Sequence, residues 1–207
     1  MTERTAHSGH YIPGLGRGFM TPMYDLVHRL FGIGKLHAAV IAAAAPSRGE
    51  RVLDIGCATG NLLRSLSKRG LDQGDLAGLD PDPKALRRAR RKVRRARLDQ
   101  GSAAHLPYPD GSLDVVFSTL MFHHLDAATK DAMLAEVARV LTPGGRLLLA
   151  DFDAHAHAHG PFGRNMETMI ADNTDLPGRL TAAGLTPEKL PPYQSKFGEV
   201  QLIRGTR

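Results

Sequence analysis

The stretch "RVLDIGCATGNLL", residues 51–63, decides the fold, because an apolar run breaks into a short turn with glycines and then starts a helix. A strand, a glycine turn and a helix in this order bring backbone close to a ligand in nucleotide-binding proteins. Neither common template fits, however. The phosphate loop ends in Gly-Lys-Ser/Thr, whereas Asn61 follows Gly60 here. The dinucleotide fingerprint has glycines at its third and sixth places, which are Ala58 and Asn61 in this chain.

Two acidic residues narrow the class of ligand. Asp54 ends the first predicted strand beside the turn, where its charge would oppose a pyrophosphate but would suit an ammonium group or another cation. Asp80 ends the next predicted strand, 24 residues beyond Gly56. A carboxylate at that place suits a ribose, because it can accept from both hydroxyls. The pattern predicts an adenosine-type ligand without phosphate, and S-adenosylmethionine is the candidate.

Length and composition favour one globular domain. The chain has 207 residues, of which 42% are hydrophobic, and this is enough for one sizeable core, so we expect a single domain over 1–207. The only cysteine, Cys57, excludes an intrachain disulfide and a multi-cysteine zinc site, and it suits a reducing compartment. The most apolar stretch, "AAVIAAAA", is too short to span a bilayer. We therefore expect a cytoplasmic protein without a transmembrane segment.

The positive charge is concentrated in one segment. Residues 87–97 carry seven arginines and one lysine, so the rest of the chain has a net charge of −2 against a total of +6. Leu86, Ala89, Val93 and Ala96 recur at steps of three and four residues, which is typical of the buried stripe of an amphipathic helix with its arginines outward. A solvated face is the favoured interpretation, and an acidic partner or a membrane surface is the alternative.

The chain divides into an N-terminal region and an alternating core. Residues 1–20 are rich in glycine and histidine, and we expect a flexible arm that acts as a lid. Residues 21–45 are expected to form two helices divided near Gly32 and Gly34, and residues 46–207 the cofactor-binding core. Strands are predicted near 51–55, 76–80, 97–101, 113–119 and 145–151, with helices at 60–69, 82–96 and 126–141.

The C-terminal tail has a different pattern. Helices are predicted near 162–171 and 175–183, before two strands near 188–196 and 198–205 that "KFGE" joins as a hairpin. Strands that alternate with helices indicate a mostly parallel sheet covered on both faces. The expected fold is therefore α/β: a doubly wound, mostly parallel seven-stranded Rossmann-like sheet with a C-terminal β-hairpin. Its ligand is expected at the carboxyl ends of the strands.

Four motifs in order resemble one known family. They are "VLDIGCATG", "GLDPDPKAL", "GSAAHLPYPDGSLDVVFSTLMFHHL" and "EVARVLTPGGRLLLAD". The chain resembles the class I S-adenosylmethionine-dependent methyltransferases, and within them the ubiquinone and menaquinone biosynthesis group, over roughly residues 22–150. The resemblance implies an enzyme that binds S-adenosylmethionine, transfers its methyl group and releases S-adenosylhomocysteine.

The resemblance also implies which residues bind the cofactor. They are Asp54, Gly56, Ala58, Thr59, Gly60, Asp80, Pro81, Ser102, Ala103 and Thr119. Asp54 would order the methionine ammonium, the turn would form the wall behind the methionine part, and Asp80 would bind the ribose. Ser102 and Ala103 would lie by the adenine, and Thr119 where the fourth strand meets the cofactor. Ala58 stands where glycine is commoner, and Ser102 where the family usually has an acid.

Histidines provide the candidates for proton transfer. His123 and His124 follow the fourth predicted strand, where either could act as a base or position the acceptor, or could simply pack the start of the helix. His155, His157 and His159 alternate beyond the fifth strand, and with Asp151 or Asp153 they could hold a metal. Ordinary loop composition is the favoured interpretation, so no metal is predicted.

Three functions compete at this point. The favoured one is transfer of a methyl group to a small molecule. An RNA or other nucleic-acid methyltransferase is favoured by the basic segment, but the chain lacks the Asn/Asp-Pro-Pro-Tyr motif that amino-methylating DNA enzymes carry after the fourth strand. A non-catalytic S-adenosylmethionine-binding module is the third. We expect a small-molecule partner and no nucleic acid.

Overall fold

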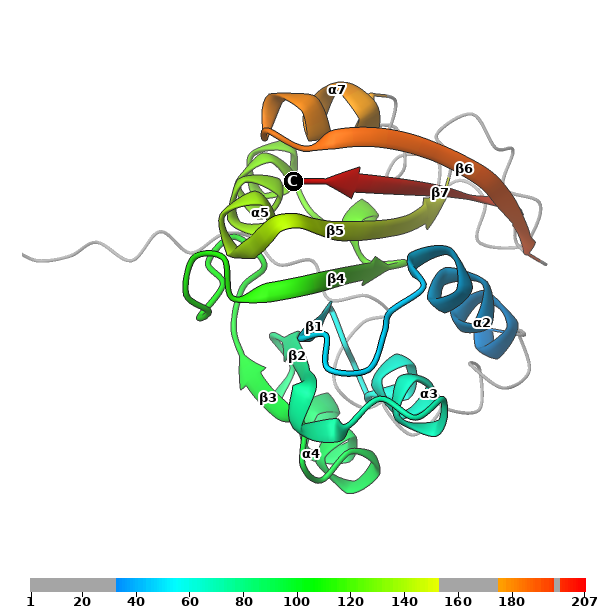
Figure 1. The fold of residues 1–207 in the computed structure, drawn as a ribbon, viewed down its shortest axis with the longest axis vertical. Helices are drawn as coiled ribbons and strands as arrows, with labels where there is room; N and C mark the ends of the chain where they lie inside the picture. Colours follow the sequence, from blue (N-terminus) through cyan, green and yellow to red (C-terminus); the bar gives the residue numbers. More distant parts are fainter. Residues whose placement is uncertain (1–32, 153–174, 196–197) are drawn as a thin grey trace, which may run out of the picture.

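The computed structural model describes residues 33–152, 175–195 and 198–207, which form a seven-stranded sheet between helices (Figure 1). The strands are β1 (Val52–Ile55), β2 (Leu76–Asp80), β3 (Arg97–Gln100), β4 (Leu113–Thr119), β5 (Leu141–Phe152), β6 (Thr186–Ser195) and β7 (Gly198–Thr206). The helices are α2 (Ile33–Ala44), α3 (Asn61–Lys68), α4 (Pro83–Lys92), α5 (Ala127–Val140) and α7 (Leu176–Ala182), with short 3₁₀ turns η1 (Gln73–Asp75) and η2 (Phe122–His124).

The strand order β3-β2-β1-β4-β5-β7-β6 confirms the predicted fold class. The five strands from β3 to β5 are parallel, and β7 runs antiparallel between β5 and β6, so the last two strands form the predicted C-terminal hairpin. From β1 the chain winds outward to β3 and then returns to β4 on the other side of β1. The strand order therefore reverses between β1 and β4, and a ligand crevice is expected at their carboxyl ends.

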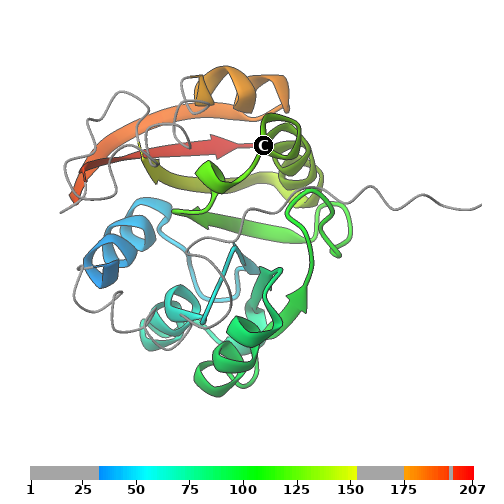
Figure 2. The same cartoon turned by 180° about the vertical axis from the view of Figure 1, so that it is seen from behind.

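Helices cover both faces of the sheet, as the apolar strands require. One buried cluster joins α2, α3 and α4 to one face, with Val40, Leu63 and Leu86 among its members. The other joins α5 and α7 to the opposite face, through residues such as Leu134 and Leu180. Figure 2 shows α5 beside α7 from behind. The two clusters place the rigid sheet between two apolar layers, and its carboxyl edge remains available for a site.

Two element boundaries differ from the prediction by more than two residues. The helix predicted over 82–96 ends at Lys92, because β3 must begin at Arg97 to pair with Ala77 of β2, and the four residues between them make the turn. The basic segment 87–97 is therefore a helix followed by a turn and the start of a strand. The strand predicted from 145 already begins at Leu141, which pairs with Leu113 before the register shifts.

Several predictions fall outside the described residues. These are the arm at 1–20, the first helix of the N-terminal pair, the helix near 162–171 and the loop with His155, His157 and His159. The second N-terminal helix is present as α2, and Gly34 lies in its first turn rather than between two helices. The single-domain assignment stays a prediction.

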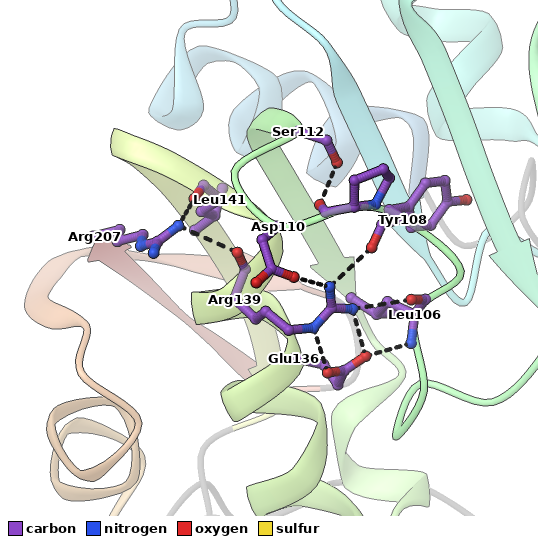
Figure 3. A network of polar contacts seen from close by, with 9 residues as sticks. Leu106, Tyr108, Asp110, Ser112, Glu136, Arg139, Leu141 and Arg207 are labelled. Carbon is purple, nitrogen blue, oxygen red and sulfur yellow. Dashed lines mark hydrogen bonds and ion pairs between the residues drawn. The ribbon is translucent and has the colours of Figure 1, made fainter.

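Arg139 of α5 holds the loop between β3 and β4 against the helix (Figure 3). Its Nη1 donates to the Tyr108 carbonyl at 2.9 Å and its Nη2 to the Leu106 carbonyl at 3.1 Å. Glu136 accepts from Arg139 Nε at 2.7 Å and from the Leu106 N–H at 2.7 Å. These bonds satisfy loop backbone groups that neither a helix nor a strand pairs. They fix the loop that begins with the predicted adenine-contacting residues.

Gly78 lies where β2 has no room for a side chain. A Cβ there would meet Cys57 Sγ at 2.8 Å and Leu63 and Leu98 at 2.9 Å. We expect Gly78→Ala to lower the free energy of unfolding by about 1–3 kcal/mol, because overpacking forces neighbours out of place. Gly34→Ala is the matched control, since nothing lies within 4 Å and it should raise stability by up to about 1 kcal/mol. Urea denaturation measures both, and equal effects would contradict the packing argument.

Candidate functional site

The turn after β1 folds back over the end of β2. The N–H groups of Gly56 and Cys57 both donate to the Leu79 carbonyl, at 2.8 and 3.1 Å. Gly56 and Gly60 each have a φ of 74°, in the left-handed region that glycine adopts readily. Gly56 also leaves no space for a side chain, because a Cβ there would lie 2.5 Å from Met121 Cγ. Backbone groups of the turn therefore form one wall of the crevice.

Ala58 adopts a left-handed conformation although it is not glycine. Its φ is 45°, which disfavours a residue with a Cβ by about 1–2 kcal/mol. The Ala58 N–H donates to Asp80 Oδ2 at 2.8 Å, and this bond opposes the strain. A glycine at this place would not carry this strain. The conformation of the turn therefore depends on the bond to Asp80.

Asp54 and Asp80 are both buried at the carboxyl edge of the sheet. Asp54 is 3% exposed, and within the described residues its carboxylate accepts no hydrogen bond. Burial raises its pKa well above the ordinary value, and the nearby Asp80 charge adds to this rise. Burial also raises the pKa of Asp80, which accepts from the N–H groups of Ala58 and Asp82 at 2.8 Å each. A buried carboxylate without partners is suited to a cationic ligand.

A cavity opens between α2 and the turn. Its lining consists of Ile33, His37, Asp54, Gly56, Cys57, Ala58, Thr59, Asn61, Leu62, Thr119 and Leu120. Five of the predicted cofactor residues thus surround one space, and Asp80 is bonded to its wall. The sequence prediction missed Ile33 and His37. His37 is the polar residue on the otherwise apolar buried face of α2, and that mismatch is the signal that could have identified it.

The other predicted residues lie apart from this cavity lining. Gly60 supports the wall from the N-cap of α3. Pro81 follows β2, and its carbonyl accepts from Gln100 Nε2 at 3.2 Å. Ser102 is exposed after β3, and its Oγ accepts from the Ala104 N–H at 3.2 Å. Ala103 packs partly against the core. The carboxyl end of β3 brings Ser102 and Ala103 to the same edge, and their adenine contact stays a prediction.

His123 and Asp151 form a buried pair at the ends of β4 and β5. His123 Nδ1 lies 2.6 Å from Asp151 Oδ1, and the His123 N–H donates to Asp151 Oδ2 at 3.1 Å. Although complete burial raises the pKa of Asp151, the charge and hydrogen bonds of His123 lower it below the ordinary value. The sequence offered Asp151 as a partner of His155, His157 and His159 in a metal site, and those three histidines lie outside the described residues. Within the described part of the chain Asp151 bonds His123, and no metal-binding cluster occurs there.

His124 has a different environment from its neighbour. Its ring lies 4.0 Å from the His123 ring, centroid to centroid. Burial, together with the charge of His123, lowers the pKa of His124 to about 4. Its Nδ1 is buried and has no hydrogen-bond partner among the described residues. His124 is therefore neutral near pH 7 and is a weak proton acceptor.

Comparisons with known proteins agree with this geometry. Residues 52–145 match the family described as "Methyltransferase domain". The chain is 32% identical over 198 residues to an uncharacterized methyltransferase of Synechocystis sp., covering 88% of this chain and 90% of that protein. It is 38% identical over 151 residues to a demethylmenaquinone methyltransferase of Deinococcus radiodurans, covering 70% of this chain and 61% of that protein. The chain thus spans about three fifths of the length of the Deinococcus enzyme.

A solved methyltransferase structure shows the same fold. A SAM-dependent methyltransferase from Aquifex aeolicus superposes with a TM-score of 0.70, at 20% identity, over 92% of this chain and 99% of that one. The chain belongs to the class I S-adenosylmethionine-dependent methyltransferases, and S-adenosylmethionine is its cofactor. Within that class it resembles the ubiquinone and menaquinone biosynthesis methyltransferases. No helix in the described part of the chain is long and apolar enough to cross a membrane.

Cofactor binding is expected to release protons through Asp54. A cation beside Asp54 lowers a pKa that burial had raised, so the affinity for S-adenosylmethionine should rise with pH between the bound and free pKa values and level off above them. Calorimetric titrations in two buffers of different ionisation enthalpy count the released protons. Asp54→Asn should bind more weakly and release fewer. A proton count identical in the variant would contradict this role.

The predicted role of Asp80 in cofactor binding can be compared with a purely structural change beside it. We expect Asp80→Ala to weaken S-adenosylhomocysteine binding about 30-fold, or about 2 kcal/mol, because a charge-assisted acceptor is lost. Asp82→Ala is the control. It removes only the N-cap of α4, whose Oδ1 accepts from the Lys84 N–H at 2.7 Å, and should lower stability by about 1 kcal/mol without changing affinity. Calorimetry and thermal unfolding measure the two effects, and equal affinity in both variants would refute the role.

Proposed function

We propose that the chain transfers the methyl group of S-adenosylmethionine to a small aromatic molecule of the phenol or quinol type, with His123 as the general base. The observation that carries this proposal is the buried His123–Asp151 pair at the carboxyl ends of β4 and β5. A carboxylate that accepts from one ring nitrogen leaves the other nitrogen with its lone pair. This arrangement suits an acceptor hydroxyl that must lose its proton as it reacts.

Each of the four residues would have a separate role in the reaction. The cofactor, when bound, supplies an electrophilic methyl group on a sulfonium sulfur. Asp54 would neutralise the ammonium of the methionine part, and Asp80 would hold the ribose. Asp151 would orient His123 through Nδ1, so that Nε2 faces the acceptor. Nε2 would then take the hydroxyl proton while the oxygen or the ring carbon forms the new bond to the methyl carbon, whose bond to sulfur breaks so that S-adenosylhomocysteine leaves with that electron pair. After attack by carbon, that ring carbon would lose its own proton and the oxygen would regain one, which restores the aromatic ring.

His123 is preferred over His124 because of their different environments. His124 bonds no carboxylate of the described residues, and its pKa of about 4 would make it accept a proton poorly near neutral pH. His123 has Asp151 at 2.6 Å to stabilise the imidazolium that proton transfer would create. The sequence treated the two histidines as equal candidates. Their unequal surroundings favour one of them.

The proposed acceptor class also draws on the relatives. Several similar proteins are named demethylmenaquinone methyltransferase or ubiquinone/menaquinone biosynthesis C-methyltransferase, at 32–38% identity. The quinols that such names describe carry a ring carbon made nucleophilic by a neighbouring hydroxyl. The matched part of this chain contains the whole sheet edge that would bind the cofactor. A cytoplasmic location stays a prediction.

The base can be tested with a reduced short-chain demethylmenaquinone as the acceptor. We expect His123→Gln to lower kcat about 100-fold or more, as loss of a general base usually does, with the affinity for S-adenosylhomocysteine unchanged. Asp151→Asn should lower kcat less and shift the pH profile, because it changes the tautomer that His123 prefers. His124→Gln is the control and should keep most of the activity.

These measurements distinguish a role of His123 as the base from a purely structural role. Thermal unfolding and S-adenosylhomocysteine binding of each variant report whether the crevice is intact. Wild-type kcat and pH profile in a folded His123→Gln protein would rule out the base. Turnover of no phenol or quinol by a wild-type protein that binds the cofactor would rule out the acceptor class.

A further inference from the structure

A basic hollow of about 490 Å³ lies between α3 and α4, away from the cofactor cavity. Its lining is polar except for one leucine and contains no aromatic ring. The lining residues are Ser67, Leu71, Asp72, Gln73, Arg91, Lys92, Arg94 and Arg95. The two helices lie side by side at the β3 end of the sheet (Figure 1). The hollow therefore gathers four cations and one carboxylate in a space large enough for a small ligand.

The charges in this basic hollow are only partly neutralised. Asp72, the one carboxylate of the lining, pairs through Oδ1 with Arg95 Nη2 at 3.0 Å. It therefore neutralises one of the four positive charges. Arg91 and Arg94 are exposed and make no hydrogen bond or ion pair with the described residues. Their guanidinium groups each offer several donors in a planar fork that matches the oxygens of a phosphate group. The excess positive charge and the fork geometry favour a phosphate-bearing anion.

Lys92 connects the basic hollow to the cofactor turn. Its Nζ donates to Thr59 Oγ1 at 3.0 Å and to Asn61 Oδ1 at 2.7 Å. Thr59 and Asn61 both line the cofactor cavity, and Asn61 Nδ2 also donates to Thr59 Oγ1 at 3.2 Å. Lys92 thus lines one site and bonds two residues of the other. An anion that attracts its ammonium group would compete directly with these bonds.

We propose that the basic hollow between α3 and α4 binds a small, soluble, phosphate-bearing anion, and that this anion weakens cofactor binding by drawing Lys92 away from Thr59 and Asn61. The inference goes beyond the acceptor chemistry and does not depend on which acceptor is methylated. It concerns two distinct sites that share one side chain. Reciprocity requires that the cofactor weaken anion binding by the same factor.

A small anion fits the basic hollow better than a nucleic acid does. Proteins that bind single strands combine a basic groove with aromatic side chains on which bases stack. None of the residues that line the hollow is aromatic. A concave space bounded by two helices also limits the ligand to a few phosphate groups. Polynucleotide binding is therefore the competing outcome that the test must distinguish.

The test uses inorganic pyrophosphate and the whole chain. Calorimetry would give the affinity for S-adenosylhomocysteine with and without saturating pyrophosphate, at an ionic strength held constant with sodium chloride. We expect an affinity about fivefold weaker with pyrophosphate, and pyrophosphate binding weakened equally by S-adenosylhomocysteine. Arg91→Gln/Arg94→Gln should lose pyrophosphate binding and keep the cofactor affinity measured in chloride. Lys92→Met should lose the coupling between the two ligands.

The control variant removes the same charge outside the basic hollow. Arg64→Gln/Arg87→Gln changes two exposed arginines of α3 and α4 that do not line it, and should bind pyrophosphate as the wild type does. Loss of pyrophosphate binding in this variant would show that general charge attracts the anion, and would overturn the proposal. So would an absence of pyrophosphate binding in the wild type, or an unchanged or tighter cofactor affinity.

Two further experiments test whether the phosphate group belongs to a nucleic acid or to a lipid instead of a small anion. A 20-nucleotide RNA that binds through Arg91 and Arg94 and is not displaced by pyrophosphate would overturn the small-anion proposal in favour of a nucleic acid. Vesicles of phosphatidylglycerol that bind the wild type, while pyrophosphate does not, would overturn it in favour of a lipid surface. Cofactor binding in plain chloride is measured in every arm, so a failure here is distinguishable from a failure of the proposed function.

Discussion

The site depends on two hydrogen bonds that the Asp80 carboxylate accepts. One oxygen accepts from the Ala58 N–H in the turn after β1, and the other from the Asp82 N–H at the start of α4. The turn can therefore keep a left-handed alanine, and β1, β2 and α4 meet at a fixed point. Asp80 is buried while it does this, with 7% of its surface exposed.

The two buried carboxylates Asp54 and Asp151 lie at the same edge of the sheet but differ in their hydrogen-bond partners. Asp54 is buried and accepts no hydrogen bond from the described residues, and burial raises its pKa. Asp151 is fully buried, but His123 and backbone N–H groups bond its carboxylate, and its pKa falls. A cation that arrives beside Asp54 favours the charged form of that carboxylate, whereas the bonds to Asp151 already favour its charged form while it orients a histidine. Burial alone does not decide the state of a carboxylate, since the partners at each strand end determine the sign of the shift.

Helix α4 contacts both the turn that lines the cofactor cavity and the basic hollow. This helix begins beside Asp80 and ends at Lys92, whose ammonium reaches Thr59 and Asn61. Ala89, midway along the helix, lies 2.9 Å from where a Cβ on Gly60 would be. The helix thus meets the turn through Lys92 and Ala89, and its N-cap Asp82 bonds Asp80, which in turn bonds Ala58.

The sequence alone determined the order of strands and helices, the glycine turn, and Asp54 and Asp80 at strand ends, because periodicity and local turn chemistry are encoded within a few residues. Only the tertiary structure decided which groups meet across the sheet. The pairing of His123 with Asp151 spans 28 residues and follows from β4 lying beside β5. His37 reaches the cavity because α2 packs over it, and α4 stops at Lys92 because β3 must pair with β2. Long-range packing sets such contacts, and no local pattern records them.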